Sequence, residues 1–217
     1  SKTFISNGGS ADFVVVVAKT DPEAGHRGMS LFAVTADTPG FERGRVLEKI
    51  GRHGADTAEL FFNDMRVPAA NLLGGEEGQG FYQLMNQLPR ERLAIAVDAV
   101  SMAEAAVLQT IDYVKERGAF GKTVFDFQNT KHELAYCKTE VYTAKVFVDH
   151  CVQLDVDGRL DATTASMAKL KATEMLDDVV DRCLQLFGGY GYMMEYPIAQ
   201  MYAAARVMRI YGGTNRS

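Results

Sequence analysis

The first third of the chain alternates short apolar runs with clusters of turn residues. Val, Phe, Leu and Ile dominate the runs at residues 3–6, 13–19, 29–34, 43–47 and 59–66. Between them lie clusters such as Asn7-Gly8-Gly9 and Thr38-Pro39-Gly40, which supply backbone angles that other residues resist. Short strands at regular spacing, with no helical pattern between them, predict an antiparallel sandwich or barrel fragment rather than βαβ units.

From about Gly80 the apolar positions recur with a helical period, and we expect a first helix that ends near Arg117. Pro89 lies inside this stretch. Proline has no amide hydrogen, so it is expected to break or restart the helix and to leave residues 90–92 in a first turn.

Two further long helices and a short one follow in the pattern. Asp161 is a candidate N-cap for the third helix, and Gly188-Gly189 a candidate stop. Pro197 suits the first position of a short fourth helix that reaches about Ile210. The second helix carries an apolar stripe at steps of three and four, formed by Leu134, Cys137, Val141, Ala144, Val148 and Cys151.

These elements predict an α+β chain with two domains. Residues 1–75 form a partial antiparallel β sandwich or barrel, and residues 76–217 form an up-down helical bundle. The glycine-rich segment 74–78 is the expected hinge between them.

The composition of the chain argues against several classes of function. The 217 residues are 47% hydrophobic and 24% charged, with a net charge of −5 and no basic stripe, so nucleic-acid binding is not expected. The longest pure aliphatic run, Val14 to Val17, suits a buried strand and predicts no membrane span.

The chain has three cysteines, an odd number, and they are widely spaced, which favours core packing over a disulfide framework or a zinc site. A reducing, cytoplasmic compartment is therefore expected. The histidines show no metal-ligand spacing, so no metal is expected.

Several short motifs occur in a fixed order along the chain. They are Phe4-Ile5-Ser6-Asn7-Gly8, Arg66-Val67-Pro68, Arg117 with Phe120-Gly121-Lys122 and Phe127-Gln128, Gln185-Leu186-Phe187-Gly188-Gly189, and Tyr211-Gly212-Gly213-Thr214. In this order and spacing the chain resembles the acyl-CoA dehydrogenase family. The resemblance implies an FAD-dependent α,β-dehydrogenation of a fatty acyl-CoA, a homotetramer and an electron-transfer flavoprotein as partner. It also implies that an N-terminal helical domain, the first part of the β domain and the last helix are missing from this chain.

In this family the catalytic carboxylate occupies one of two places. Most members carry it in a Tyr-Glu-Gly-Thr sequence, whereas the long-chain and isovaleryl branches carry it in a Glu-Arg pair. Here Gly212 stands in the first place, and Glu91 with Arg92 stands in the second. The resemblance is therefore to the long-chain type and implies that Glu91 removes the α-proton.

The residues around Glu91 fit such a base. Leu88, Leu93 and Ile95 are its apolar neighbours in sequence. A carboxylate among apolar side chains is poorly solvated, which makes it a stronger base. The alternative is that Glu91 only neutralises the dipole at a helix N-terminus.

Further site residues follow from the resemblance. Gly212 and Gly213 let a backbone amide approach the thioester carbonyl oxygen. Arg92 holds the Glu91 carboxylate or the nearby chain in place, or is an ordinary surface arginine. The substrate would be lined by Tyr82, Pro89, Arg90 and Arg92. The FAD would be contacted by Phe4, Ile5, Ser6 and Thr214, by Arg117, Phe120 and Gln128 from a neighbouring subunit, and by Gln185, Gly188 and Gly189 near the pyrophosphate. Arg216 departs from the family pattern and is given no role.

Two other functions remain open. The first is an acyl-CoA oxidase-like flavoenzyme on the same fold, which differs by a rapid reaction of its reduced flavin with oxygen. The second is a non-catalytic oligomeric fragment, which differs by holding no flavin.

Overall fold

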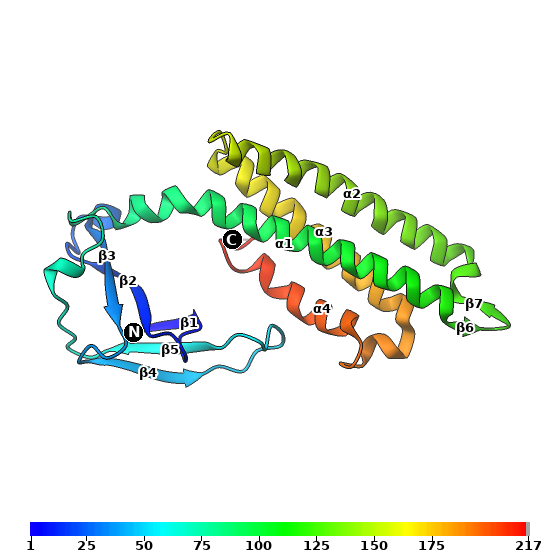
Figure 1. Cartoon of the computed structure of the whole chain (residues 1–217), viewed down its shortest axis with the longest axis horizontal. Coiled ribbons are helices and arrows are strands. Elements are labelled where there is room, and N and C mark those ends of the chain that lie inside the picture. The colour runs from blue at the N-terminus through cyan, green and yellow to red at the C-terminus, as the bar shows by residue number, and fades with distance from the viewer. Residues whose placement is uncertain (216–217) are drawn as a thin grey trace. The chain divides into compact units, whose positions relative to one another are not determined.

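The computed structural model describes residues 1–215 and divides the chain into two compact units, Ser1–Gln87 and Leu88–Ser217. The first unit contains the two sheets formed by residues 2–62, and the second contains the helical bundle, in the order that the sequence predicts (Figure 1). The α+β prediction is confirmed.

Two antiparallel sheets make up the first unit. One is a hairpin of β2 and β3, paired in unbroken register from Phe13–Thr35 to Lys19–Met29. The other has the order β1-β5-β4. The buried side chains of these sheets include Val16, Leu31, Val34 and Leu60. The strands are β1 (Lys2–Ser6), β2 (Phe13–Lys19), β3 (Met29–Thr35), β4 (Phe41–Val46) and β5 (Thr57–Phe62).

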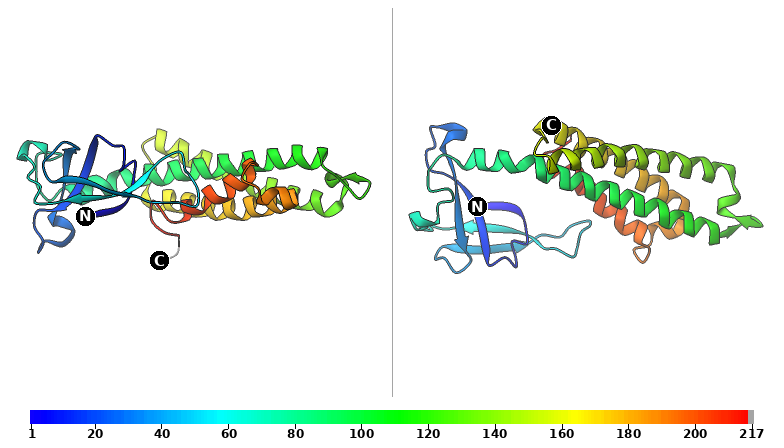
Figure 2. Two further views of the ribbon diagram at one scale, coloured as in Figure 1. Left: turned by 90° about the horizontal axis from the view of Figure 1, so that it is seen from below. Right: turned by 45° about the horizontal axis from the view of Figure 1, so that its top comes forward.

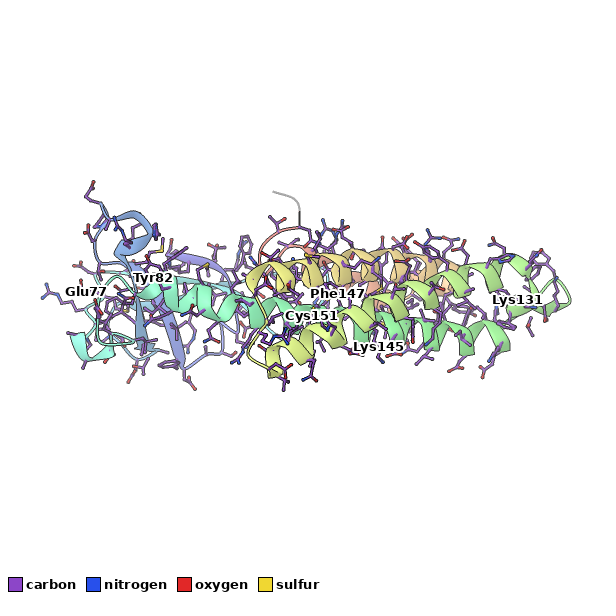
Figure 3. All side chains as sticks on the ribbon, turned by 90° about the horizontal axis from the view of Figure 1, so that it is seen from above. Glu77, Tyr82, Lys131, Lys145, Phe147 and Cys151 are labelled. Carbon is purple, nitrogen blue, oxygen red and sulfur yellow. The ribbon has the colours of Figure 1, made fainter. Side chains whose placement is uncertain are left out.

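The second unit is the predicted bundle. Its long helices run side by side in every view (Figures 1 and 2). Between α1 and α2 lies a small hairpin, β6 (Gly118–Ala119) and β7 (Lys122–Thr123), which the sequence patterns did not predict. The helices are α1 (Gly80–Glu116), α2 (Gln128–Val156), α3 (Ala162–Phe187) and α4 (Pro197–Ala205). Figure 3 labels Lys145, Phe147 and Cys151 along α2.

The local signals at the ends of α3 act as predicted. The Asp161 carboxylate accepts hydrogen bonds from the Thr163 and Thr164 amides at 2.8 and 2.9 Å. The Thr164 hydroxyl, which donates to the same carboxylate at 2.6 Å, and after it these amides lower the pKa of Asp161. At the other end Gly188 has φ 58°, a conformation that glycine adopts at little cost.

The predicted stripe of α2 faces the bundle core. All six of its residues are buried, and the five from Cys137 to Cys151 belong to the core cluster that α2 shares with α1 and α3. A hydrogen bond with Cys183 on α3, together with burial, raises the pKa of the Cys137 thiol. The three cysteines are buried free thiols, as the sequence predicts.

The expected break at Pro89 is wrong, because α1 is one helix from Gly80 to Glu116. A proline inside a helix costs about 3 kcal/mol. Contacts on both sides hold the helix in place. Before Pro89, the Gln83 side chain donates to the Leu73 carbonyl at 3.0 Å; after it, Leu93 and Ala96 are in the bundle core.

Two consequences follow from this continuous helix. Glu91 lies in the interior of α1, so the interpretation that it neutralises an N-terminal dipole is wrong. The division between the compact units, at Gln87–Leu88, also lies inside α1, because the first turns of this helix pack on the strand unit. A Cβ on Gly80, for example, would lie 2.9 Å from the Ser30 backbone.

Within the described residues, α1 is long and apolar enough to cross a membrane by length and composition alone. Its apolar residues include Leu93, Ala96, Ala99, Ala103 and Ala106, which form one wall of the bundle core. A core helix passes the same test, so the absence of a membrane span stays a prediction.

Candidate active site

The glycine loop after α4 lies directly on α1. Gly212 and Gly213 have φ 63° and 97°, which few residues other than glycine adopt. A Cβ built on Gly212 would lie 2.5 Å from Ile95 Cδ1. Arg92 Nε donates to the Gly212 carbonyl oxygen at 3.1 Å. The loop is therefore packed against one face of α1 at positions 92 and 95.

Glu91 is on this face of the helix. Residues four apart lie one above the other on a helix, so Glu91 and Ile95 share a side of α1. The Glu91 side chain is exposed and open to a ligand. Arg92, the residue after Glu91, binds Gly212 across 120 positions of sequence, so the two alternative places for a catalytic carboxylate are neighbours in space.

The apolar surroundings expected for Glu91 are only partly formed by this chain. Leu93 points into the bundle core, and Ile95 packs against that core and meets Gly212. Leu88 is half-buried. The expectation that these three side chains enclose the carboxylate is wrong, because helical geometry turns neighbours in sequence to different sides of α1.

Arg92 holds the loop in place. In addition to its bond to Gly212, its Nη1 donates to Ser166 Oγ on α3 at 2.7 Å. Of the sequence-based alternatives, the one in which Arg92 fixes the nearby chain is the one that the geometry favours. The guanidinium ties three segments together: α1, α3 and the loop.

The close packing at Gly212 gives a test by substitution. We expect Gly212→Ala to lower the free energy of unfolding by about 1–2 kcal/mol from the positive φ, and by a further amount from the contact with Ile95. Chemical denaturation measures the change. Gly158→Ala is the matched control, since Gly158 has φ 68° and nothing within 4 Å of a Cβ. Equal losses at the two positions would contradict the steric argument, as would a failure of Ile95→Val to relieve the loss at Gly212.

A second group of predicted residues lines a cavity of about 590 Å³ at the other end of α3. Arg117, Gln185, Gly188 and Gly189 are all in its lining. The Arg117 guanidinium lies 5.4 Å from the Tyr190 ring centroid, a cation–π distance. The floor is aromatic, because Tyr113 stacks on Phe187 with ring centroids 4.1 Å apart.

This cavity fits the nucleotide part of a flavin. A guanidinium recognises phosphate oxygens by charge-assisted hydrogen bonds. Gly188 and Gly189 have no atoms within 4 Å of a built Cβ, so their backbone is open to a ligand. Phe120 and Gln128, which the sequence assigned to the same function, are exposed and lie outside this lining.

Two predicted flavin contacts have unusual backbones. Phe4 and Phe120 have φ 61° and 52°, and positive φ is a genuine outlier for a bulky residue. Both rings are exposed, at 77% and 95% of their full surface. At Phe4 the pairing of β1 with β5 shifts register between Lys2 and Ile5, which re-aims the side chain. Strain of this kind gathers at ligand sites, which favours a binding function for both rings.

The remaining predicted residues are dispersed. Ile5 is half-buried and Ser6 exposed on β1. Tyr82, labelled on the first turns of α1 in Figure 3, is exposed and lies edge-on to Phe81. Pro89 is half-buried inside α1, whereas Arg90 forms an ion pair with Asp155 at 3.0 Å. Arg216 lies outside the described residues.

The sequence patterns missed the polar network under the glycine loop. Lys169 is 3% exposed, and its Nζ donates to the Gly213 carbonyl and to Asn215 Oδ1, both at 2.7 Å. A signal was available, because residue 169 lies four positions after the buried Ala165 and three before the buried Ala172. A lysine on the apolar face of a helix needs buried partners.

Comparisons with known proteins match nearly the whole chain to one family. The family model described as acyl-CoA dehydrogenase, middle domain, matches residues 1–65, and the model described as acyl-CoA dehydrogenase, C-terminal domain, matches residues 78–217. The long-chain specific acyl-CoA dehydrogenase, mitochondrial, of Sus scrofa is 53% identical over 217 residues, which cover 99% of this chain and 50% of the relative.

Solved structures agree as well. The acyl-CoA dehydrogenase from Geobacillus kaustophilus superposes with a TM-score of 0.96 and 52% identity, over 99% of this chain and 57% of that one. A chain in a structure titled for the electron transferring flavoprotein of Acidaminococcus fermentans has a TM-score of 0.94 and 39% identity, over 99% and 56%. The chain thus spans about half the length of the curated relatives it matches.

Proposed function

The chain belongs to the acyl-CoA dehydrogenase family, and we propose that the enzyme containing it forms trans-2-enoyl-CoA from a long-chain acyl-CoA with Glu91 as the base. One observation carries the choice of Glu91. Gly212, the other family position for a carboxylate, is packed on Ile95 with no room for a side chain, while Glu91 is exposed on the same face of α1.

The reaction places separate demands on the chain. The base must take a proton from the α-carbon of the thioester, and the carbonyl oxygen must be polarised as charge develops on it. Glu91 would remove the α-proton, and a backbone amide of the Gly212–Gly213 loop would polarise the carbonyl oxygen. The Arg92 bond to the Gly212 carbonyl fixes this loop relative to the helix that carries the base.

Members of this family are flavoproteins, and we propose FAD as the cofactor. When bound, FAD would supply the acceptor for the β-hydride of the substrate. Phe4, Ile5, Ser6 and Thr214 would hold one FAD, whereas Arg117, Phe120, Gln128, Gln185, Gly188 and Gly189 would hold the nucleotide part of the FAD of a neighbouring subunit. This arrangement requires a homo-oligomer, for which we propose a tetramer.

We propose that the electrons pass to an electron-transfer flavoprotein. The buried free cysteines support a reducing compartment, for which we propose the cytoplasm. Anaerobic reduction by acyl-CoA followed by exposure to air separates this function from the oxidase alternative. Slow reoxidation in air supports the dehydrogenase, and oxidation at the rate of turnover supports the oxidase.

The preference for long chains is tested by turnover with butyryl-, octanoyl- and palmitoyl-CoA. The proposal rests on the Glu91–Gly212 pairing and on 53% identity to a long-chain specific relative. We expect kcat/KM to be highest for palmitoyl-CoA. The highest value for butyryl-CoA would contradict the long-chain assignment.

The 217-residue chain alone is expected to hold FAD weakly or not at all, to self-associate and to have negligible activity. High affinity needs a closed, mostly dry site, and the relatives are about twice as long. Exposed apolar side chains such as Tyr142 and Val146 favour association. Absorbance of the purified chain, FAD titration and light scattering measure these properties. Stoichiometric flavin in the purified chain, or dye reduction by acyl-CoA, would contradict the expectation.

A further inference from the structure

We propose that Lys169 is a positioning residue that holds the Gly213 carbonyl and thereby sets the backbone amides of the loop over α1. The inference rests on the proposed function. Its starting point is the burial of Lys169 on α3, where a charged side chain is costly unless its donors are satisfied. Both of its bonds, to Gly213 O and Asn215 Oδ1, go to the loop.

The Gly212–Gly213 loop needs neighbouring groups to fix its conformation. Two consecutive glycines have many accessible backbone conformations, so their sequence alone does not hold a fixed path. A donor that polarises a carbonyl must be in place before the reaction, and a displacement of about 1 Å costs about 100-fold in rate. The order of the loop must therefore come from groups around it.

Peptide geometry shows what the two cations achieve. The peptide unit is planar and trans, so the carbonyl of one residue and the N–H of the next point in opposite directions. Arg92 binds the Gly212 carbonyl and Lys169 the Gly213 carbonyl. Together they fix two successive peptide planes and turn the N–H groups of Gly213 and Thr214 away from the cations.

A second layer holds Asn215, the other acceptor of Lys169. Its Nδ2 donates to Thr173 Oγ1 at 2.8 Å and to Glu174 Oε1 at 2.9 Å, and its backbone N–H donates to the Arg209 carbonyl. Arg209 is in turn paired with Glu174 and Asp177. The loop is thus bonded to α1 at Gly212 and to α3 at Gly213 and Asn215.

Burial disfavours the positive charge of Lys169, so the hydrogen bonds of this side chain must compensate for the loss of water around it. Burial, followed by repulsion from Arg92, lowers the pKa of Lys169, while Glu174 opposes this shift. Removing Lys169 leaves the Gly213 carbonyl and the Asn215 amide oxygen without their donor, which is destabilising for each buried acceptor left unsatisfied. A structural and a positioning lysine would both lower stability when removed, so the test needs a catalytic readout.

The test compares Lys169→Met with Lys171→Met in the flavin-loaded enzyme. Lys171 is on the same helix and forms an exposed ion pair with Glu140 at 2.7 Å, so it controls for loss of one positive charge. For Lys169→Met we expect kcat to fall about 10- to 100-fold with KM nearly unchanged. We also expect the variant to remain folded, with an unfolding midpoint below that of the wild type because the two acceptors lose their donor. Lys171→Met should keep the wild-type kcat.

Chemical rescue adds a readout that a structural role does not predict. A cavity of about 190 Å³ is lined by Arg92, Ser166, Lys169, Gly213, Thr214 and Asn215, and Lys169→Ala would enlarge it. Methylammonium should restore a part of the kcat lost in Lys169→Ala, and tetramethylammonium, which has no N–H donor, should not. Equal effects of the two cations would overturn the proposal.

A third measurement is independent of catalysis. In the 217-residue chain, amide hydrogens of residues 208–215 should exchange at least about tenfold faster in Lys169→Met than in the wild type or Lys171→Met. If the wild type does not dehydrogenate acyl-CoA, the proposed function fails, while hydrogen exchange still decides the role of Lys169. If the wild type is active and Lys169→Met keeps both kcat and slow exchange, the role of Lys169 alone is refuted.

Discussion

Glu91→Gln is expected to lower the turnover of acyl-CoA by about 100- to 10,000-fold, the usual cost of removing a general base. Glutamine keeps the size of the side chain and its place on α1 but cannot accept the α-proton. Exchange of the α-hydrogen of the substrate with deuterated solvent should be lost as well. Turnover by dye reduction and exchange by mass spectrometry measure the two effects in the flavin-loaded enzyme.

The exposure of Glu91 makes this a clean experiment. Because its side chain is exposed, the substitution should leave the unfolding midpoint close to that of the wild type. Glu116→Gln, at the exposed end of the same helix, is the control and should keep full activity. Turnover of Glu91→Gln within a few-fold of the wild type would refute the assignment of the base.

Arg117→Ala is expected to weaken FAD binding by about 10- to 100-fold, since a hydrogen bond to a charged group contributes about 1.5–3 kcal/mol. If Arg117 holds the FAD of a neighbouring subunit, the same substitution should weaken the oligomer. A ligand that spans two subunits binds only the assembled state and so stabilises it. Flavin titration and light scattering across a range of protein concentrations measure the two effects.

Arg159→Ala provides the comparison for this experiment. Arg159 is an exposed arginine in the turn between α2 and α3, away from the cavity that Arg117 lines. It should change neither FAD affinity nor assembly. Unchanged FAD affinity together with an unchanged oligomer in Arg117→Ala would refute the bridge between subunits.

The predicted elements that hold in the structure are those set by neighbours in sequence. The run from Phe13 to Lys19 is a strand with the predicted bounds. Asp161 caps α3 and Gly188 ends it, because a cap is a hydrogen bond to an amide two or three residues away. The stripe of α2 is buried because a helical period of 3.6 turns all its members to one side.

The predictions that fail depend on contacts with distant residues. Pro89 was expected to break α1, but packing on both sides of it holds the helix continuous. The surroundings of Glu91 were inferred from its neighbours in sequence, whereas the nearest turn of α1 presents Ile95 to Gly212.

The sequence by itself determined the order of the elements and the family resemblance, and it was enough to propose Glu91, rather than position 212, as the place of the base. These depend on residue identity and local spacing. Only the tertiary structure placed Gly212 on Ile95, gathered Arg117, Gln185, Gly188 and Gly189 around one cavity, and buried Lys169 under the loop. These arrangements join residues tens of positions apart, and they are fixed by the packing of helices, which no local pattern specifies.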